Sequence, residues 1–169
     1  PYQGTYRQDF TVVRTRLEGQ AFIPVFTEKF VMAARAVWGA VWDAPSAQDL
    51  PSSLRFYSGG GGSVRGYASQ SVGPRHEKRD PLGRISQFET NLEARVRITE
   101  SIGLVAFLDG GMVYDDLDAD LFSDMLWGAG AGFRYYTPIG PVRADLAFPL
   151  DRRKGDSAWQ AYISIGQSF

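Results

Sequence analysis

The sequence predicts an all-β protein, specifically an antiparallel transmembrane β-barrel, and three observations support this. Apolar and polar residues alternate with period two along seven stretches, as expected when one face of a strand meets lipid and the other meets water. The polar face carries charges in the middle of strands, which suits a wet lumen. Aromatic residues gather near strand ends, as they do at the two surfaces of a bilayer: Trp38, Trp42, Tyr114, Trp127, Tyr135, Tyr136, Trp159 and Phe169.

The first two predicted strands are Phe10–Ile23 and Phe30–Trp42, joined by a short turn at Pro24–Glu28. In the first, the odd-numbered residues from position 13 form the apolar face, and charged residues such as Arg16 lie on the other parity. In the second, the even-numbered residues are apolar and Arg35 lies on the opposite face. Both lengths suit tilted strands that cross a bilayer.

The next two predicted strands are Gln87–Thr99 and Ile102–Tyr114, again separated by a short turn. The first alternates without a break, with glutamate, asparagine and arginine on its polar parity. The polar parity of the second holds Phe107, Asp109 and Gly111. These three side chains should therefore point into the lumen of a barrel.

Three further strands are predicted at Trp127–Thr137, Val142–Leu150 and Trp159–Phe169. A tight turn at Pro138–Pro141 joins the first two, and a charged loop at Asp151–Ser157 joins the last two. Three glycines alternate along the inward parity of the first of these strands and leave space beside it: Gly128, Gly130 and Gly132.

One long connection, Asp43–Ser86, shows no sustained alternation. A loop of this length inside a compact domain is usually functional or disordered. It contains four consecutive glycines followed closely by Arg65. Short turns on one side and long loops on the other are typical of outer-membrane barrels.

Asp109 is the natural partner for this arginine. A lumenal carboxylate, an aromatic ring two residues away and a glycine that leaves room together form a receptor for one guanidinium. We therefore expect Arg65 to pair with Asp109 and to stack on Phe107, beside Gly111, with the long loop folded into the barrel.

Several motifs resemble the BamA/TamA family of outer-membrane assembly factors, also called the bacterial surface antigen family. Val64-Arg65-Gly66-Tyr67 is similar to the signature of that family's sixth extracellular loop. Phe107–Gly111 is similar to the strand motif that holds the loop arginine inside the barrel. Gly132–Leu150 resembles the penultimate hairpin of the TamA branch, and Ile165–Phe169 resembles the family's final strand.

The resemblance implies that residues 1–169 are the C-terminal part of a transmembrane barrel, about seven of sixteen strands, with an inward-folding extracellular loop at residues 43–86. It also implies that the periplasmic POTRA domains of the family are absent from this chain. The protein would lie in the outer membrane of a Gram-negative bacterium.

The function implied is most like that of TamA, the assembly of autotransporters and other β-barrel proteins through a lateral seam. The implied partners are outer-membrane lipid, substrate barrel proteins and a periplasm-spanning, TamB-like protein of the inner membrane. The alternatives are a BamA-type assembly factor, a two-partner secretion pore and a plain small channel. Three upstream POTRA repeats would indicate TamA, five BamA and two a secretion pore.

The end of the chain is expected to act as both a seam and an assembly signal, through Ile163, Ile165, Gly166 and Phe169. Phe169 shares the lipid-facing parity with the two isoleucines, and a glycine weakens the strand. We expect no cofactor and no metal site, since the chain has one histidine and no cysteine. We also expect no enzyme, because the addition of a strand at a seam makes and breaks no covalent bond. A net charge of −1 gives no general attraction for nucleic acid.

Overall fold

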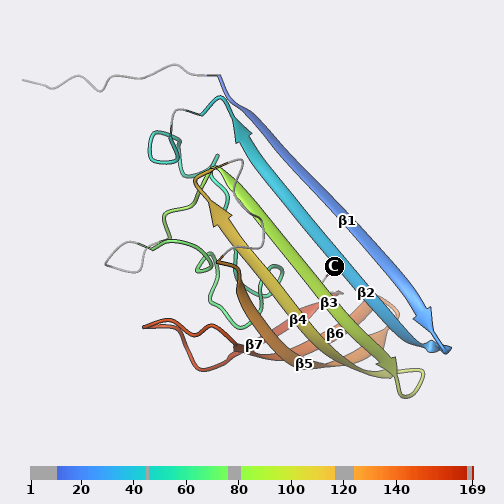
Figure 1. Ribbon diagram of the computed structural model, residues 1–169. Coiled ribbons are helices and arrows are strands. Elements are labelled where there is room, and N and C mark those ends of the chain that lie inside the picture. The colour runs from blue at the N-terminus through green and yellow to red at the C-terminus, as the bar shows by residue number, and fades with distance from the viewer. Residues whose placement is uncertain (1–10, 45, 76–80, 117–123, 167–168) are drawn as a thin grey trace, which may run out of the picture.

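A computed structural model describes residues 11–44, 46–75, 81–116, 124–166 and 169 (Figure 1). These residues form one seven-stranded sheet in which each strand pairs with the next along the chain. All six pairings are antiparallel. The strands are β1 Val13–Val25, β2 Thr27–Trp42, β3 Ser86–Arg97, β4 Ile102–Tyr114, β5 Leu126–Thr137, β6 Gly140–Pro149 and β7 Gln160–Ile165. In the described part of the chain, no helix is long and apolar enough to span a membrane.

The sheet is strongly curved, and its concave side faces the long segment that connects β2 to β3 (Figure 1). This arrangement confirms the predicted all-β class and all seven strands. The turn between β1 and β2 is shorter than predicted. β1 continues to Val25 and β2 begins at Thr27, so Phe26 alone forms the turn, with a φ of 61°. The last strand is shorter than predicted, because Gly166 has a φ of 103° and ends the extended backbone after Ile165.

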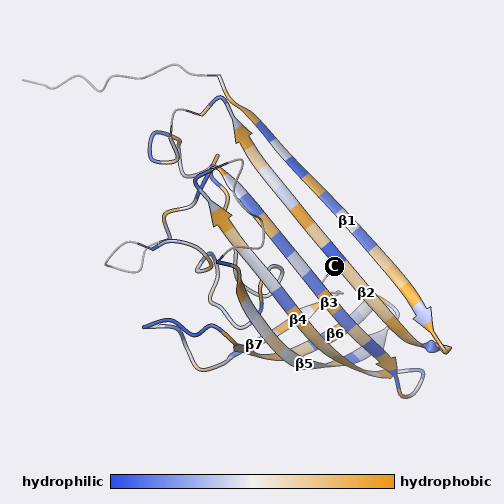
Figure 2. Cartoon of the chain, in the orientation of Figure 1, coloured by the Kyte–Doolittle hydropathy of each residue, from blue (hydrophilic) through white to orange (hydrophobic). Residues whose placement is uncertain are grey.

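The two faces of the sheet differ in the way that the alternation predicts. Figure 2 shows hydrophilic and hydrophobic residues alternating along β1 and β3. On the outward face, Leu17 is 61% exposed and Ile163 is 82% exposed. On the inward face, Arg134 and Glu93 are fully buried. A charged interior behind an apolar exterior is what a strand wall between lipid and lumen requires.

The strand register brings inward residues of different strands to the same height. Asn91 of β3 lies opposite Asp109 of β4, which in turn lies opposite Gly128 of β5. One step along, Glu93 lies opposite Phe107. The register therefore collects several polar and aromatic side chains on one patch of the inner wall.

The hydrophobic core lies between this inner wall and the long loop, residues 43–86. One buried cluster joins Leu50 and Phe56 of the loop to Val41 and Val113 of the sheet. A second cluster lies within the loop and joins Val64, Tyr67 and Val72. The loop is thus packed against the lumenal side of the sheet, where it positions the arginine considered next.

Candidate functional site

Arg65 is held by a fork of hydrogen bonds to Asp109, and both side chains are almost completely buried. Its Nε donates to Oδ2 at 2.6 Å, and its Nη2 donates to Oδ1 at 2.9 Å. The backbone N–H of Arg65 also donates to Oδ2, at 3.1 Å. A planar guanidinium bound at two nitrogens is fixed in orientation as well as in position.

Phe107 and Gly111 complete the receptor on the same strand face. The guanidinium carbon of Arg65 lies 3.5 Å from the centre of the Phe107 ring, which is close enough for a cation–π contact. A Cβ atom at Gly111 would lie only 2.7 Å from Cγ2 of Val64. The glycine therefore leaves room for the loop. The structure thus brings together the four residues predicted to hold the loop, which are Arg65, Phe107, Asp109 and Gly111.

Two further carboxylates, Glu93 of β3 and Asp145 of β6, also bind the loop arginine. Nη1 of Arg65 lies 2.6 Å from Oε1 of Glu93 and 3.3 Å from Oδ2 of Asp145. Arg134 pairs with Asp145, and Arg95 pairs with Glu93 at 2.7 Å. Neither Glu93 nor Asp145 is predicted as a site residue from the sequence, because only the strand register brings them to Arg65.

The cluster, made of Arg65, Glu93, Asp109 and Asp145 and called here the loop anchor, keeps the arginine charged. Burial disfavours the charged form, but the hydrogen bonds and charges of Asp109 and Glu93 outweigh burial and raise the pKa of Arg65. A buried guanidinium is tolerated only when it is paired and hydrogen-bonded in this way.

The two residues that follow Arg65 in the loop motif, Gly66 and Tyr67, also pack closely against the sheet. Gly66 has a φ of 100°, and a Cβ atom there would lie 2.9 Å from the backbone carbon of Phe148. Tyr162 of β7, which the sequence analysis did not select, accepts from the N–H of Gly66 and donates to the carbonyl of Tyr67. Burial raises the pKa of Tyr67 to about 12, so its hydroxyl stays protonated and donates to the Trp127 carbonyl at 3.0 Å.

Side chains of β3 and β6 hold the glycine run that precedes the motif. Nδ2 of Asn91 donates to the carbonyl of Ser63 at 2.6 Å, and the Ser63 hydroxyl bonds Glu89. Nη2 of Arg143 donates to the carbonyl of Gly61 at 2.6 Å. The carbonyls of the glycine-rich segment are therefore bound by side chains of the inner wall.

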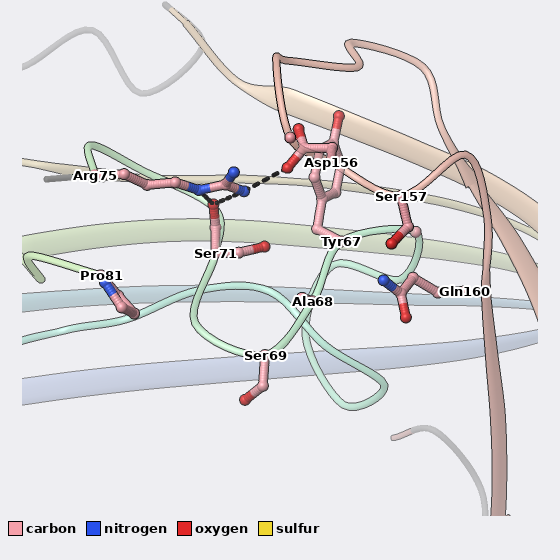
Figure 3. Close-up of a pocket in the computed structure, with 11 residues that line it drawn as sticks. Tyr67, Ala68, Ser69, Ser71, Arg75, Pro81, Asp156, Ser157 and Gln160 are labelled. Carbon is pink, nitrogen blue, oxygen red and sulfur yellow. Dashed lines mark hydrogen bonds and ion pairs between the residues drawn. The ribbon is translucent and has the colours of Figure 1, made fainter. Parts of the chain in front are cut away.

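A second set of ion pairs ties the long loop to the segment between β6 and β7 (Figure 3). Arg75 donates to the carbonyl of Ser71 and lies 2.6 Å from Asp156. Arg153 donates to the carbonyls of Ser71 and Gly73. These contacts border a cavity of about 190 Å³. We call Arg75, Arg153 and Asp156 the loop clasp.

The ion pairs of the loop clasp are expected to lose their stabilising effect only in strong acid, where Asp156 becomes protonated. Burial raises the pKa of Asp156, but the Arg153 N–H and the Arg75 side chain outweigh it and lower that pKa below its usual range. Because the folded-state pKa is depressed, the stabilisation is present above about pH 4 and is lost as the pH falls through the folded-state value. Hydrogen exchange of residues 71–75, corrected for intrinsic rates, should be constant from pH 7 to pH 5 and rise below about pH 4.

Asp156→Asn should show faster exchange in the same segment at pH 7, by roughly two- to fivefold, the range for partly exposed pairs. Asp49→Asn provides the matched control, because Asp49 is exposed and contacts nearby Ser46 in the first part of the long loop. A clasp variant whose exchange equals that of the parent at pH 7 would show that these charges do not hold the loop.

The seam residues lie apart from the loop anchor, and one of them is not where the alternation placed it. Ile163 and Ile165 point outward, as predicted. Phe169 does not share their face: its ring lies 6.3 Å from the ring of Phe22 and 5.1 Å from the guanidinium of Arg95, both on the lumenal side. The parity prediction for Phe169 is wrong because the positive φ of Gly166 breaks the alternation.

A curved antiparallel sheet with an apolar outer face, a charged inner face and a loop arginine held inside defines the wall of an outer-membrane β-barrel. Residues 3–169 match the model of the Omp85 superfamily domain. The chain therefore belongs to the Omp85 superfamily. This confirms the predicted relationship to the BamA/TamA family and the predicted location in the bacterial outer membrane.

Two curated relatives are outer membrane protein assembly factors named BamA. The protein of Nitratidesulfovibrio vulgaris is 34% identical over 145 residues, which cover 82% of this chain and 18% of the relative. The protein of Neisseria meningitidis serogroup B is 24% identical over 157 residues, which cover 72% of this chain and 19% of the relative. This chain thus spans about a fifth of their length. The relatives are assembly factors by name, which supports the expectation that the chain is not an enzyme.

A solved structure shows the same fold. The crystal structure of BamA from Haemophilus ducreyi lacking POTRA domains 1–3 superposes with a TM-score of 0.71 at 20% sequence identity. The match covers 89% of this chain and 34% of the solved one. The similarity extends to the architecture of the barrel wall.

Proposed function

We propose that this chain is part of a factor that assembles and inserts other β-barrel proteins in the outer membrane. The observation that carries the proposal is the loop anchor. Carboxylates from β3, β4 and β6 hold one arginine of the long loop against the inner wall. A lumen filled by a fixed loop is poorly suited to free diffusion, which disfavours a plain channel. The names of the two BamA relatives support the same function.

The proposed mechanism uses the edge of the sheet. An edge strand presents unpaired N–H and C=O groups to which an incoming substrate strand can add. Within the described residues, the pairing of β6 with β7 runs over six residues of β7, from Gln160 to Ile165. A short final strand makes few hydrogen bonds to any neighbour. It is therefore suited to a seam that opens laterally toward outer-membrane lipid.

Two subtypes of assembly factor fit the chain. A TamA-like factor, acting on autotransporters with a TamB-like partner in the inner membrane, is supported by the resemblance of the Gly132–Leu150 hairpin. A BamA-type factor is supported by the curated relatives, both named BamA. A two-partner secretion pore remains the third alternative. Counting the POTRA repeats upstream of this chain in the full-length protein separates the three.

Gly166→Val tests the seam. The structure requires a positive φ at Gly166, which a β-branched residue disfavours. Valine should therefore favour an extended final strand and a closed seam. We expect normal amounts of protein in the membrane but several-fold slower insertion of an unfolded barrel substrate, measured as protease-protected substrate in liposomes that contain the full-length protein. An intramolecular cross-link between the last strand and the first strand of the barrel should have the same effect.

Gly140→Val is the matched control. Gly140 also has a positive φ, 117°, and also has open space around its Cβ position. It is the first residue of β6, directly after the tight turn from β5, and β6 separates β5 from β7 in the sheet. If both variants slow insertion equally, backbone strain explains the effect. If neither does, the lateral seam is not where this protein acts.

A further inference from the structure

A further contact joins the long loop to the sheet, at Phe56. This side chain is buried, and its ring packs over β2, where a Cβ atom at Gly39 would lie only 2.6 Å from it. The guanidinium carbon of Arg14, on the inward parity of β1, lies 4.1 Å from the centre of the same ring. The ring of Phe56 therefore meets the bare backbone of one strand and the cation of the next, at a distance suited to a cation–π contact.

The cleft beside this contact is rich in positive charge. It is a cavity of about 290 Å³, and the charged residues that line it are Arg14, Arg16, Arg35, Arg55 and Glu89. Glu18 pairs with Arg16 and with Arg35, at 2.8 Å in each case. Arg55 donates to backbone carbonyls of the long loop, which carry no net charge. Four cations thus meet two carboxylates, which leaves an excess of two positive charges.

Inward arginines of this wall pair with carboxylates on neighbouring strands. Arg35 of β2 pairs with Glu18 of β1 on one side and lies 3.5 Å from Glu89 of β3 on the other. Arg14 differs, because no carboxylate of the described residues lies within ion-pair distance of it. It lies on β1, which is at one end of the described sheet. In a closed barrel every strand is paired on both sides, so a partner for Arg14 can come from the other side of β1.

We propose that Arg14 binds the carboxylate of an aspartate or glutamate on the barrel strand that pairs with the other side of β1, and that this ion pair holds Arg14 over Phe56. The excess positive charge of the cleft attracts a carboxylate. A guanidinium can bind both oxygens of a carboxylate through one edge while its face stays on an aromatic ring. The long loop is then held to the wall at Phe56 as well as at Arg65. This inference goes beyond the proposed function.

Carbodiimide cross-linking of Arg14→Lys identifies the partner. The reagent joins an amine to a carboxylate in direct contact as an amide and takes up the water that is lost. In the full-length protein in lipid, we expect an intramolecular cross-link from position 14 to an acidic residue on the strand that precedes β1, mapped by mass spectrometry. Arg16→Lys is the positive control, because Arg16 lies 2.8 Å from Glu18. Its cross-link to Glu18 shows that the reagent reaches the inner wall.

Loss of the cation should loosen the loop at Phe56. The N–H of Phe56 donates to the carbonyl of Arg84 at 2.8 Å, and the N–H of Arg84 donates back at 3.0 Å, so both amides report on this segment. In Arg14→Gln we expect their hydrogen exchange to be about two- to fivefold faster, the size of one exposed cation–π contact. Arg97→Gln is the matched control, because Arg97 also lies over an aromatic ring, that of Tyr136 on β5. Replacing the partner carboxylate with its amide should have the same effect as Arg14→Gln.

The proposal is overturned if Arg16→Lys forms its cross-link but Arg14→Lys forms none, or forms one only to residues outside the preceding strand. Exchange in Arg14→Gln that is no faster than in Arg97→Gln would also overturn it. Only variants that keep the heat-modifiable mobility of the parent protein are compared, and if Arg14→Gln does not fold, the cross-link of Arg14→Lys decides. Neither readout measures insertion of substrates, so the result is independent of the proposed function.

Discussion

Arg65→Ala is expected to release the long loop from the inner wall and to abolish most of the assembly activity. The substitution leaves three buried carboxylates without their shared cation, those of Glu93, Asp109 and Asp145. Removing one partner of a buried pair typically costs about 3–5 kcal/mol. Limited proteolysis within residues 43–75 should become at least tenfold faster in folded, membrane-inserted protein.

Two variants separate charge from geometry. Arg65→Lys keeps the positive charge but cannot bind both oxygens of Asp109 or stack on Phe107, so we expect it to restore only part of the protection. Arg152→Ala is the control, because Arg152 is exposed and its Nε donates to the carbonyl of Asp156. If Arg65→Ala is digested no faster than Arg152→Ala, the loop anchor does not hold the loop.

Gly128→Val is expected to have a comparably large effect, by steric exclusion. A Cβ atom at Gly128 would fall on the backbone carbonyl oxygen of Arg65, far inside contact distance. Backbone atoms of the anchored motif cannot move aside as a side chain can, so the loop must leave the wall. We expect a loss of about 1–3 kcal/mol or more, as in overpacked cores, and protease sensitivity like that of Arg65→Ala.

Gly19→Val provides the control for the loss of a strand glycine. Gly19 lies in β1 and has no atom within 4 Å of its Cβ position. Valine there should be neutral or slightly favourable, because β-branched residues suit strands. Equal sensitivity of the two variants would show that the close approach of Arg65 to β5 is not required for folding of the loop.

The strands and the core of the site could be predicted from sequence because both depend on alternation. Parity alone places Asp109, Phe107 and Gly111 on one inward face, and the motif around Arg65 supplies their partner. Local spacing cannot predict which strands lie side by side or at what height. Alternation therefore places Glu93 on the polar face of its strand but does not predict that it binds Arg65.

Other features depend on the backbone path and not on the pattern of residues. The prediction for Phe169 assumes that the final strand stays extended, whereas the extended backbone ends at Gly166, whose φ is positive. Tyr162 binds the backbone of the long loop through its hydroxyl, yet on β7 it is only one inward residue among several. Such contacts between segments distant in sequence require the folded arrangement.

From the sequence alone, reversal of both charges, at Arg65 and at Asp109, is expected to restore some of the activity that is lost in either single variant. The structure makes this a poor test, because an aspartate at position 65 would face Glu93 and Asp145 as well. A double-mutant cycle with neutral replacements avoids that repulsion.

The most direct test of the loop anchor is therefore the coupling free energy between Arg65→Ala and Asp109→Asn. It is measured from urea unfolding of the full-length protein in lipid, with the two single variants and the double variant. The anchor predicts that the double variant is more stable than the sum of the single losses implies, by about 2 kcal/mol or more. Losses that add to within about 0.5 kcal/mol would mean that the two residues act independently, and they would contradict an anchored loop.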